Sequence, residues 1–175
     1  MMVVNLFGAP GSGKSTGAAR IFSNLKMKGI NAELVTEYAK DKVWEENKAV
    51  FNDQFYIFGK QNFRLSRLKD KVDVVITDSP IFLSILYNKT YTNTFDKLVK
   101  EIFNSYNNLN FFIRRVKPYC PIGRFQTEKE SDGLSISLKE LLDFHKIEYI
   151  EANGNIEDYD NKITNIILGR LNNEN

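Results

Sequence analysis

The chain has 175 residues, of which 42% are hydrophobic and 13% aromatic, so we expect one domain with a full core. Its formal net charge of +2 excludes a protein that binds polyanions through overall charge, although a local basic patch such as Arg114-Arg115 is compatible with it. The single cysteine cannot form an internal disulfide, which suits a reducing cytoplasm.

No stretch approaches the ~18 consecutive apolar residues of a membrane span. The N-terminal residues 1–7 lack a basic region and a small-residue cleavage site, so they predict a first strand and not a signal peptide. We therefore expect a single cytoplasmic domain over residues 1–175 that does not associate with membranes. Composition does not distinguish a monomer from a homodimer.

Strands and helices are predicted to alternate along the chain. Short apolar or β-branched runs predict strands at residues 2–7, 32–36, 72–77, 109–116 and 147–151. Helical spacing of apolar residues predicts helices at residues 15–28, 38–46, 51–68, 81–88, 95–106, 135–146 and 156–171. Gly29 is placed to cap the first helix. The alternation predicts a doubly wound parallel sheet in a three-layer α/β/α sandwich.

The loop after the first predicted strand fits the pattern G-x-x-x-x-G-K-[ST] at every fixed position. Its glycines let the backbone N–H groups point inward at a phosphate, and the following helix adds the positive end of its dipole. Lys14 is expected to reach the β- and γ-phosphates, and the Ser15 hydroxyl to bind Mg²⁺. A chance glycine turn is the alternative, which the complete pattern between a strand and a helix disfavours. The candidate nucleotide contacts are Gly8, Ala9, Pro10, Gly11, Ser12, Gly13, Lys14, Ser15 and Thr16.

A second acidic candidate, Asp78, ends the apolar strand predicted at residues 72–77. The C-terminal ends of parallel strands face the ligand in such folds, so Asp78 is placed to hold Mg²⁺ directly or through water. The alternative is that Asp78-Ser79-Pro80 only forms a turn after the strand.

Three segments together resemble small P-loop nucleoside and nucleotide kinases, notably kinase-like proteins of bacteriophages and the ribosylnicotinamide kinase domain. They are Gly8–Ser15, Thr36–Lys40 and Asp78–Pro80. The resemblance covers nearly the whole chain in the order of its elements, but only the phosphate loop is specific by itself. It implies a sheet of about five parallel strands, ATP with Mg²⁺ as the donor and an acceptor site beside the second and third strands. It also implies a lid after the fourth strand, at about residues 114–134.

The sequence departs from this family at one position. Members often have Glu-Tyr-Ala-Arg where this chain has Glu37-Tyr38-Ala39-Lys40. A point charge thereby replaces a bidentate fork, which argues against tight binding of an acceptor phosphate at this position.

Glu37 is the candidate for positioning or deprotonating an acceptor hydroxyl, with a solvated charge at a strand end as the alternative. A phosphate acceptor would need cations instead, for which the candidates are Lys40, Lys42, Arg64 and Arg67. A base could be framed by Tyr38, Phe55, Phe58 and Gln61, although the aromatic residues among them are also typical of a core.

The lid segment offers candidate arginines for stabilising the transferred phosphoryl group, with Arg124 first and Arg115 second. An exposed basic loop is the alternative. The predicted catalytic residues are thus Lys14, Glu37, Asp78, Arg124 and Arg115, with Ser15 and Asp78 as metal ligands.

The leading hypothesis is an ATP- and Mg²⁺-dependent kinase of a nucleoside monophosphate or nucleoside. One alternative acceptor is a polynucleotide, either at a 5′ end or at a hydroxymethyl base of phage DNA, with phosphate contacts from Arg114, Arg115, Lys117 and Arg124. The near-neutral net charge argues mildly against it. A third possibility is an NTP-hydrolysing switch that has no acceptor.

Overall fold

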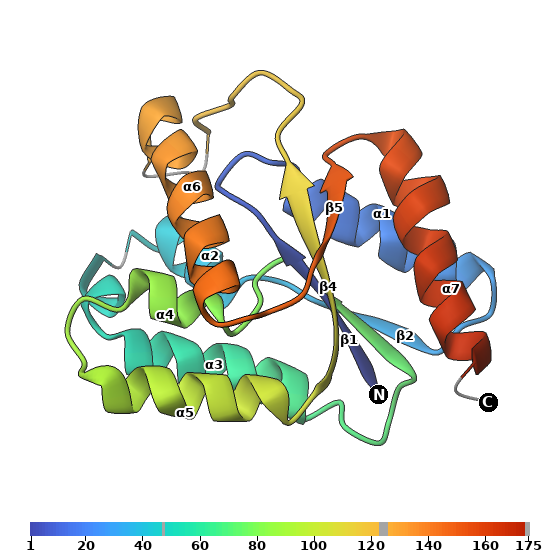
Figure 1. Ribbon diagram of the computed structural model, residues 1–175, viewed down its shortest axis with the longest axis horizontal. Helices are drawn as coiled ribbons and strands as arrows, with labels where there is room; N and C mark the ends of the chain where they lie inside the picture. The colour runs from blue at the N-terminus through green and yellow to red at the C-terminus, as the bar shows by residue number, and fades with distance from the viewer. Residues whose placement is uncertain (47, 123–125, 174–175) are drawn as a thin grey trace.

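The computed structural model describes residues 1–46, 48–122 and 126–173 (Figure 1). A five-stranded sheet forms its centre, with the strand order β2-β3-β1-β4-β5 and all neighbours parallel. The strands are β1 (Met2–Phe7), β2 (Ala32–Val35), β3 (Val74–Thr77), β4 (Asn107–Arg114) and β5 (Ile150–Asn153). The predicted three-layer α/β/α fold with about five parallel strands is confirmed.

Helices cover both faces of the sheet (Figure 1). On one face lie α1 (Lys14–Met27) and α7 (Thr164–Asn173), the latter preceded by a π-helical turn, η2 (Asp158–Ile163). The other face is covered by α3, α5 and α6, with α4 beside them. The bounds on this side are α2 (Tyr38–Trp44), the 3₁₀ turn η1 (Lys48–Asn52), α3 (Gln54–Ser66), α4 (Leu83–Tyr87), α5 (Asn93–Asn104) and α6 (Glu128–Phe144).

Two hydrophobic cores follow from the period-2 alternation of the strands. Met2, Val4 and Leu6 of β1 pack toward α1 and α7, whereas Val3 and Phe7 pack toward α3, α5 and α6. Because both faces are covered, all six residues of β1 are buried. The strand that carries the phosphate loop is therefore enclosed along its whole length, as is its neighbour β3.

The strand order decides which loops meet. β1 lies between β3 and β4, with Asn5 opposite Thr77 and Phe7 opposite Phe112. Since all three strands run in the same direction, the loops that follow β1 and β3 emerge side by side at one edge. The topology thus brings the phosphate loop next to Asp78.

Several predicted boundaries are confirmed and others shift for local reasons. Gly29 has a φ of +77°, and the N–H groups of Gly29 and Ile30 donate to the carbonyls of Lys26 and Leu25, which closes α1 as predicted. The helix predicted at residues 51–68 is divided, because the Asp53 side chain accepts from the Tyr56 N–H and starts α3 anew.

The helix predicted from residue 135 begins seven residues earlier, at Glu128. A capping box explains the earlier start, since the Thr127 hydroxyl accepts from the Glu130 N–H and the Glu130 carboxylate accepts from the Thr127 N–H. The acidic run assigned to the lid is therefore the first turn of α6. The last strand also lies later than predicted, at Ile150–Asn153, because those residues pair with β4.

None of the described helices is long and apolar enough to cross a membrane.

Replacing Thr127 with alanine should lower the free energy of unfolding by about 1 kcal/mol, because the first turn of α6 loses its cap. Urea denaturation followed by far-UV circular dichroism measures this. Thr92→Ala is the matched control, since Thr92 precedes α5 in the same extended conformation but its side chain makes no capping bond. An equal loss in both variants would contradict a role for the capping box.

Candidate functional site

The phosphate loop has the backbone conformation that its glycines allow. Gly8 and Gly13 have φ values of +147° and +100°. A Cβ atom would lie 2.7 Å from the Ile113 carbonyl oxygen at position 8 and 2.6 Å from the Tyr159 hydroxyl at position 13. Neither position accepts another residue without strain. Gly13 then leads directly into α1, so the N-terminus of that helix opens on the loop.

Lys14 folds back over the loop. Its Nζ donates to the carbonyls of Gly8 at 2.7 Å and Ala9 at 3.0 Å, and the side chain lines the adjoining cavity. Ser15 and Thr16, at the start of α1, line the same cavity. An ammonium group and a helix N-terminus at one concave loop form a site for an anion such as a triphosphate.

Residues from the C-terminal part of the chain hold the loop from outside, and sequence patterns alone did not identify them. The Ser131 hydroxyl of α6 donates to the Pro10 carbonyl at 2.7 Å, and the Tyr159 hydroxyl of η2 donates to the Gly13 carbonyl at 3.0 Å. Burial, with a smaller contribution from the charge of Asp158, raises the pKa of Tyr159 to about 12, so its hydroxyl keeps the donated proton.

Gly154, directly after β5, packs against the loop backbone. Its N–H donates to the Arg114 carbonyl at 2.8 Å, and a Cβ atom at this position would lie only 2.1 Å from the Ser12 carbonyl oxygen. The Asn153-Gly154 pair in the sequence marks this position, but only the tertiary structure shows that it supports the phosphate loop.

Asp78 lies one residue beyond β3, is 4% exposed and lines the cavity with Ser15. If Asp78 only formed a turn, its carboxylate would be expected to accept hydrogen bonds from the backbone N–H groups of the residues that follow it. The Thr77 hydroxyl accepts from the Ser79 N–H instead, at 3.1 Å, and Asp78 Oδ1 is buried with no hydrogen-bond partner in the described parts of the chain. A buried, unpaired carboxylate oxygen beside a hydroxyl fits a divalent cation, so both predicted metal ligands suit Mg²⁺.

A cavity of about 320 Å³ extends from the phosphate loop to a side compartment bounded by α2, α3 and α4. We define the side compartment by Glu37, Lys40, Val43, Phe51, Gln54, Ile57, Ile81, Leu83, Ser84 and Tyr87. Most of these side chains are apolar. Gln54 and Ser84 are almost completely buried, and their side chains make no hydrogen bonds to other described residues.

Glu37 lies where the side compartment meets the phosphate loop. Burial raises the pKa of its carboxyl; the nearby Lys14 ammonium opposes the shift, and the charge of Asp78 adds to it. Across the compartment, burial and the charge of Glu37 raise the pKa of Tyr87 to about 12. This half-buried position disfavours the alternative of a fully solvated charge, and it brings Glu37, Lys14 and Asp78 to one cavity.

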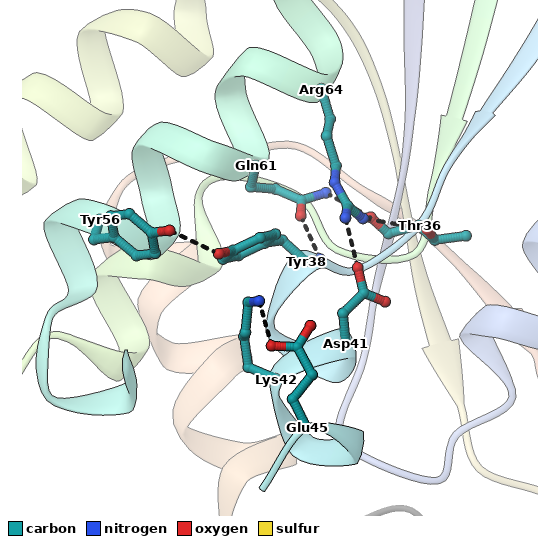
Figure 2. Close-up of polar contacts among 8 residues, drawn as sticks. All are labelled: Thr36, Tyr38, Asp41, Lys42, Glu45, Tyr56, Gln61 and Arg64. Carbon is teal, nitrogen blue, oxygen red and sulfur yellow. Dashed lines mark hydrogen bonds and ion pairs between the residues drawn. The ribbon is translucent and has the colours of Figure 1, made fainter. Parts of the chain in front are cut away.

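The predicted acceptor cations are divided between two places. Lys40 lines the side compartment, whereas Arg64 and Arg67 line a second cavity of about 400 Å³ together with Tyr38 and Asp41. Arg64 pairs with Asp41, and Lys42 pairs with Glu45 (Figure 2).

The residues predicted to frame a base do not gather as a group. Phe58 is part of the core, and Phe55 is exposed on the surface beside Tyr91. Gln61 does line the cavity, but its amide bonds to the backbone of Thr36 and Tyr38. The aromatic and amide side chains of Phe51, Gln54 and Tyr87 line the compartment beside it.

Of the two candidate arginines in the predicted lid, the structure describes only Arg115. Arg115 pairs with Asp132 at 2.5 Å and Glu128 at 3.2 Å, and it does not line the cavity. These pairs hold its guanidinium against α6, and its predicted catalytic role stays a prediction. Arg124 lies outside the described residues. Gln126 and Ile122, on either side of that stretch, both line the cavity.

Comparison with known proteins identifies the group to which this fold and phosphate loop belong. The model of a family described as "AAA domain" matches residues 3–158. The chain belongs to this AAA domain family. No curated protein matches the chain.

This membership supports a nucleotide-binding P-loop protein with the activity of a nucleotide hydrolase or a kinase. P-loop AAA domains typically bind their nucleotide together with Mg²⁺, which agrees with the arrangement of Ser15 and Asp78 in this AAA domain. The family does not identify a phosphoryl acceptor.

Gly154→Ala should weaken binding of ATP·Mg²⁺ by about 10-fold or more, since the added methyl group displaces the Ser12 backbone at an overpacking cost of ~1–3 kcal/mol. Isothermal titration calorimetry measures the affinity. Gly169→Ala in α7 is the control, because a Cβ atom there meets nothing within 4 Å. Unchanged affinity in Gly154→Ala would refute this support of the loop.

Asp78→Asn should raise the Mg²⁺ concentration for half-maximal nucleotide binding by roughly 10-fold, the usual size of such losses in metal affinity. A fluorescent ATP analogue titrated at increasing Mg²⁺ provides the measurement. Asp73→Asn is the control, because Asp73 directly precedes the same strand at its opposite end and is exposed. If both variants keep the wild-type Mg²⁺ dependence, Asp78 serves only the turn.

Proposed function

We propose that this AAA domain is a kinase that transfers the γ-phosphoryl group of ATP to a small nucleoside-like acceptor. The observation that carries the proposal is the side compartment, which opens on the phosphate loop with Glu37 at the junction. A hydrolase needs room only for water beside the γ-phosphate. An apolar compartment with unpaired polar groups fits a second organic substrate.

Its lining favours a hydroxyl group over a phosphate as the nucleophile. Among the described residues that line the cavity, Lys14 and Lys40 are the cationic ones, and Lys14 already serves the phosphate loop. A monophosphate would therefore meet one point charge and the carboxylate of Glu37. A nucleoside would place its base against the apolar wall, within reach of the Gln54 amide. A nucleoside monophosphate is the second candidate, because Lys40 does line the compartment.

A polynucleotide acceptor has less support. Arg115 is held by two acids of α6, and Arg114 lies 3.8 Å from Glu151. Acidic partners reduce the attraction of these arginines for a phosphate backbone.

The proposed reaction uses the site residues in separate roles. The phosphate loop and Lys14 would hold the donor phosphates, and Ser15 and Asp78 would hold Mg²⁺, which would supply charge neutralisation at the phosphates. Glu37 accepts the proton of the acceptor hydroxyl as the hydroxyl oxygen bonds to the γ-phosphorus, and the γ-phosphoryl bond to ADP breaks so that ADP leaves. Because its raised pKa lies closer to neutrality, Glu37 is a stronger base than an ordinary carboxylate.

A phosphoryl-transfer screen with labelled ATP tests the proposal against nucleosides, nucleoside monophosphates and DNA oligonucleotides. We expect transfer to at least one nucleoside, and almost none with Lys14→Ala, whose loss should cost ~3–4 kcal/mol in the transition state. Release of inorganic phosphate without transfer to any acceptor would instead identify a hydrolase.

Glu37→Gln should reduce kcat for a hydroxyl acceptor by ~10²–10⁴-fold, the usual contribution of a general base. In the wild type, kcat should rise with pH as Glu37 loses its proton, above the ordinary glutamate range because its pKa is raised. This rise of kcat with pH should be absent from Glu37→Gln. Glu33→Gln, on the exposed start of β2, is the control. Full activity of Glu37→Gln on a nucleoside would exclude Glu37 as the base.

A further inference from the structure

The backbone on both sides of Glu37 is held by one side chain of α3. Gln61 Oε1 accepts from the Tyr38 N–H at 2.8 Å, and Gln61 Nε2 donates to the Thr36 carbonyl at 3.3 Å (Figure 2). The Thr36 carbonyl belongs to the peptide before Glu37, and the Tyr38 N–H to the peptide after it. A single buried amide thus fixes both peptide planes that meet at the Cα atom of Glu37.

Arg64, one turn further along α3, strengthens the same hold. Its guanidinium donates to the Thr36 carbonyl at 3.1 Å and pairs with Asp41 in the first turn of α2 at 2.5 Å (Figure 2). The group also lies over the Tyr38 ring, 5.2 Å from its centre. Arg64 therefore ties the end of β2 to the start of α2, with Glu37 between them.

The Glu37 side chain has no hold of its own. Glu37 precedes α2 with φ −64° and ψ 119°, and its carboxylate forms neither a capping bond nor a hydrogen bond to any described residue. Since no described side chain holds the carboxylate, the backbone sets its reach through the direction of the Cα–Cβ bond of Glu37.

We propose that Gln61 and Arg64 are positioning residues that fix the backbone of Glu37 and thereby aim its carboxylate at the acceptor. This inference rests on the proposed function, in which Glu37 is the base. It also gives these residues a role other than those suggested by the sequence. Gln61 acts on the backbone and not on a base, and Arg64 acts from the second cavity and not on an acceptor phosphate.

An ordinary surface ion pair is the alternative for Arg64, because its side chain is 26% exposed and that of Asp41 is 49% exposed. Such a pair contributes little by itself. The planar guanidinium, however, reaches a backbone carbonyl and a carboxylate at the same time, which the single ammonium of lysine cannot do in the same geometry. The two explanations therefore differ in how much activity Arg64→Lys should retain. A simple ion pair predicts nearly full activity, whereas the clamp on the backbone predicts only part of it.

Arg64→Ala should lower kcat for the acceptor by about 10- to 100-fold, the range for a small misplacement of a reacting group, while the KM for ATP changes little. Arg64→Lys should recover only part of this loss. Arg67→Ala is the matched control, because Arg67 directly follows the same helix and lines the same second cavity but makes no hydrogen bond to the Thr36–Tyr38 segment. Its kcat should stay within about twofold of wild type.

A double-mutant cycle separates positioning from a general structural effect. In a Glu37→Gln background, Arg64→Ala should have almost no further effect on kcat, because the group that it positions is already absent. An undiminished effect in that background overturns the proposal. So does a kcat of Arg64→Ala close to that of the wild type.

Hydrogen–deuterium exchange tests the clamp without any acceptor. The Tyr38 amide should exchange faster in Gln61→Ala and Arg64→Ala than in the wild type and Arg67→Ala, and equal protection in all four proteins overturns the proposal. If exchange rises as expected while Glu37→Gln keeps full transfer activity, the clamp stands but the proposed role of Glu37 as the base fails. The two failures are therefore distinguishable.

Discussion

The conformation of the phosphate loop is the constraint on which the rest of this structure depends. The loop makes a turn bond of its own, from the Ser12 N–H to the Ala9 carbonyl at 3.2 Å, and side chains from other parts of the chain hold further carbonyls of the loop. Lys14 binds two of its carbonyls from inside, while Ser131 and Tyr159 bind two more from outside. Gly154 lets the end of β5 approach the loop closely. The chain from α6 to η2 thus supports a loop more than a hundred residues away in sequence.

The sheet order places the charges of the site in a fixed relation. With β3 directly beside β1, the carboxylate of Asp78 faces the same cavity as Lys14, and the end of β2 adds Glu37. Lys14 favours the charged form of Glu37, whereas burial and Asp78 favour the neutral form. A cation held by Asp78 would favour the charged form of Glu37, whereas the negative donor phosphates would favour its neutral form. Binding of the donor would therefore change the proton affinity of the proposed base.

Much of this arrangement could be predicted from the sequence, because the informative signals are local. The phosphate loop has a fixed pattern, the strands have continuous apolar runs, and Asp78 follows directly on one of them. The capping bonds of Asp53 and Thr127 could not be predicted from the sequence as reliably as these patterns. The start of α6 and the division before α3 were therefore missed. The anchors Ser131 and Tyr159 carry no pattern, since a hydroxyl that reaches a distant carbonyl looks like any other serine or tyrosine in a helix. The same applies to the compartment residues Gln54 and Tyr87.

The placement of cations shows most clearly why acceptor chemistry cannot be derived from charge in the sequence. Lys40 and Lys42 form one pair of cations along the chain and Arg64 and Arg67 another, yet Lys40 alone among these four lines the side compartment. Glu37 lines the first cavity, whereas its neighbours Thr36 and Tyr38 line the second together with Arg64 and Arg67. From there, Arg64 acts on the backbone that carries Glu37. Under the proposed function, residues that look like an acceptor-phosphate site in the sequence would instead support the carboxylate that receives the proton of a hydroxyl acceptor.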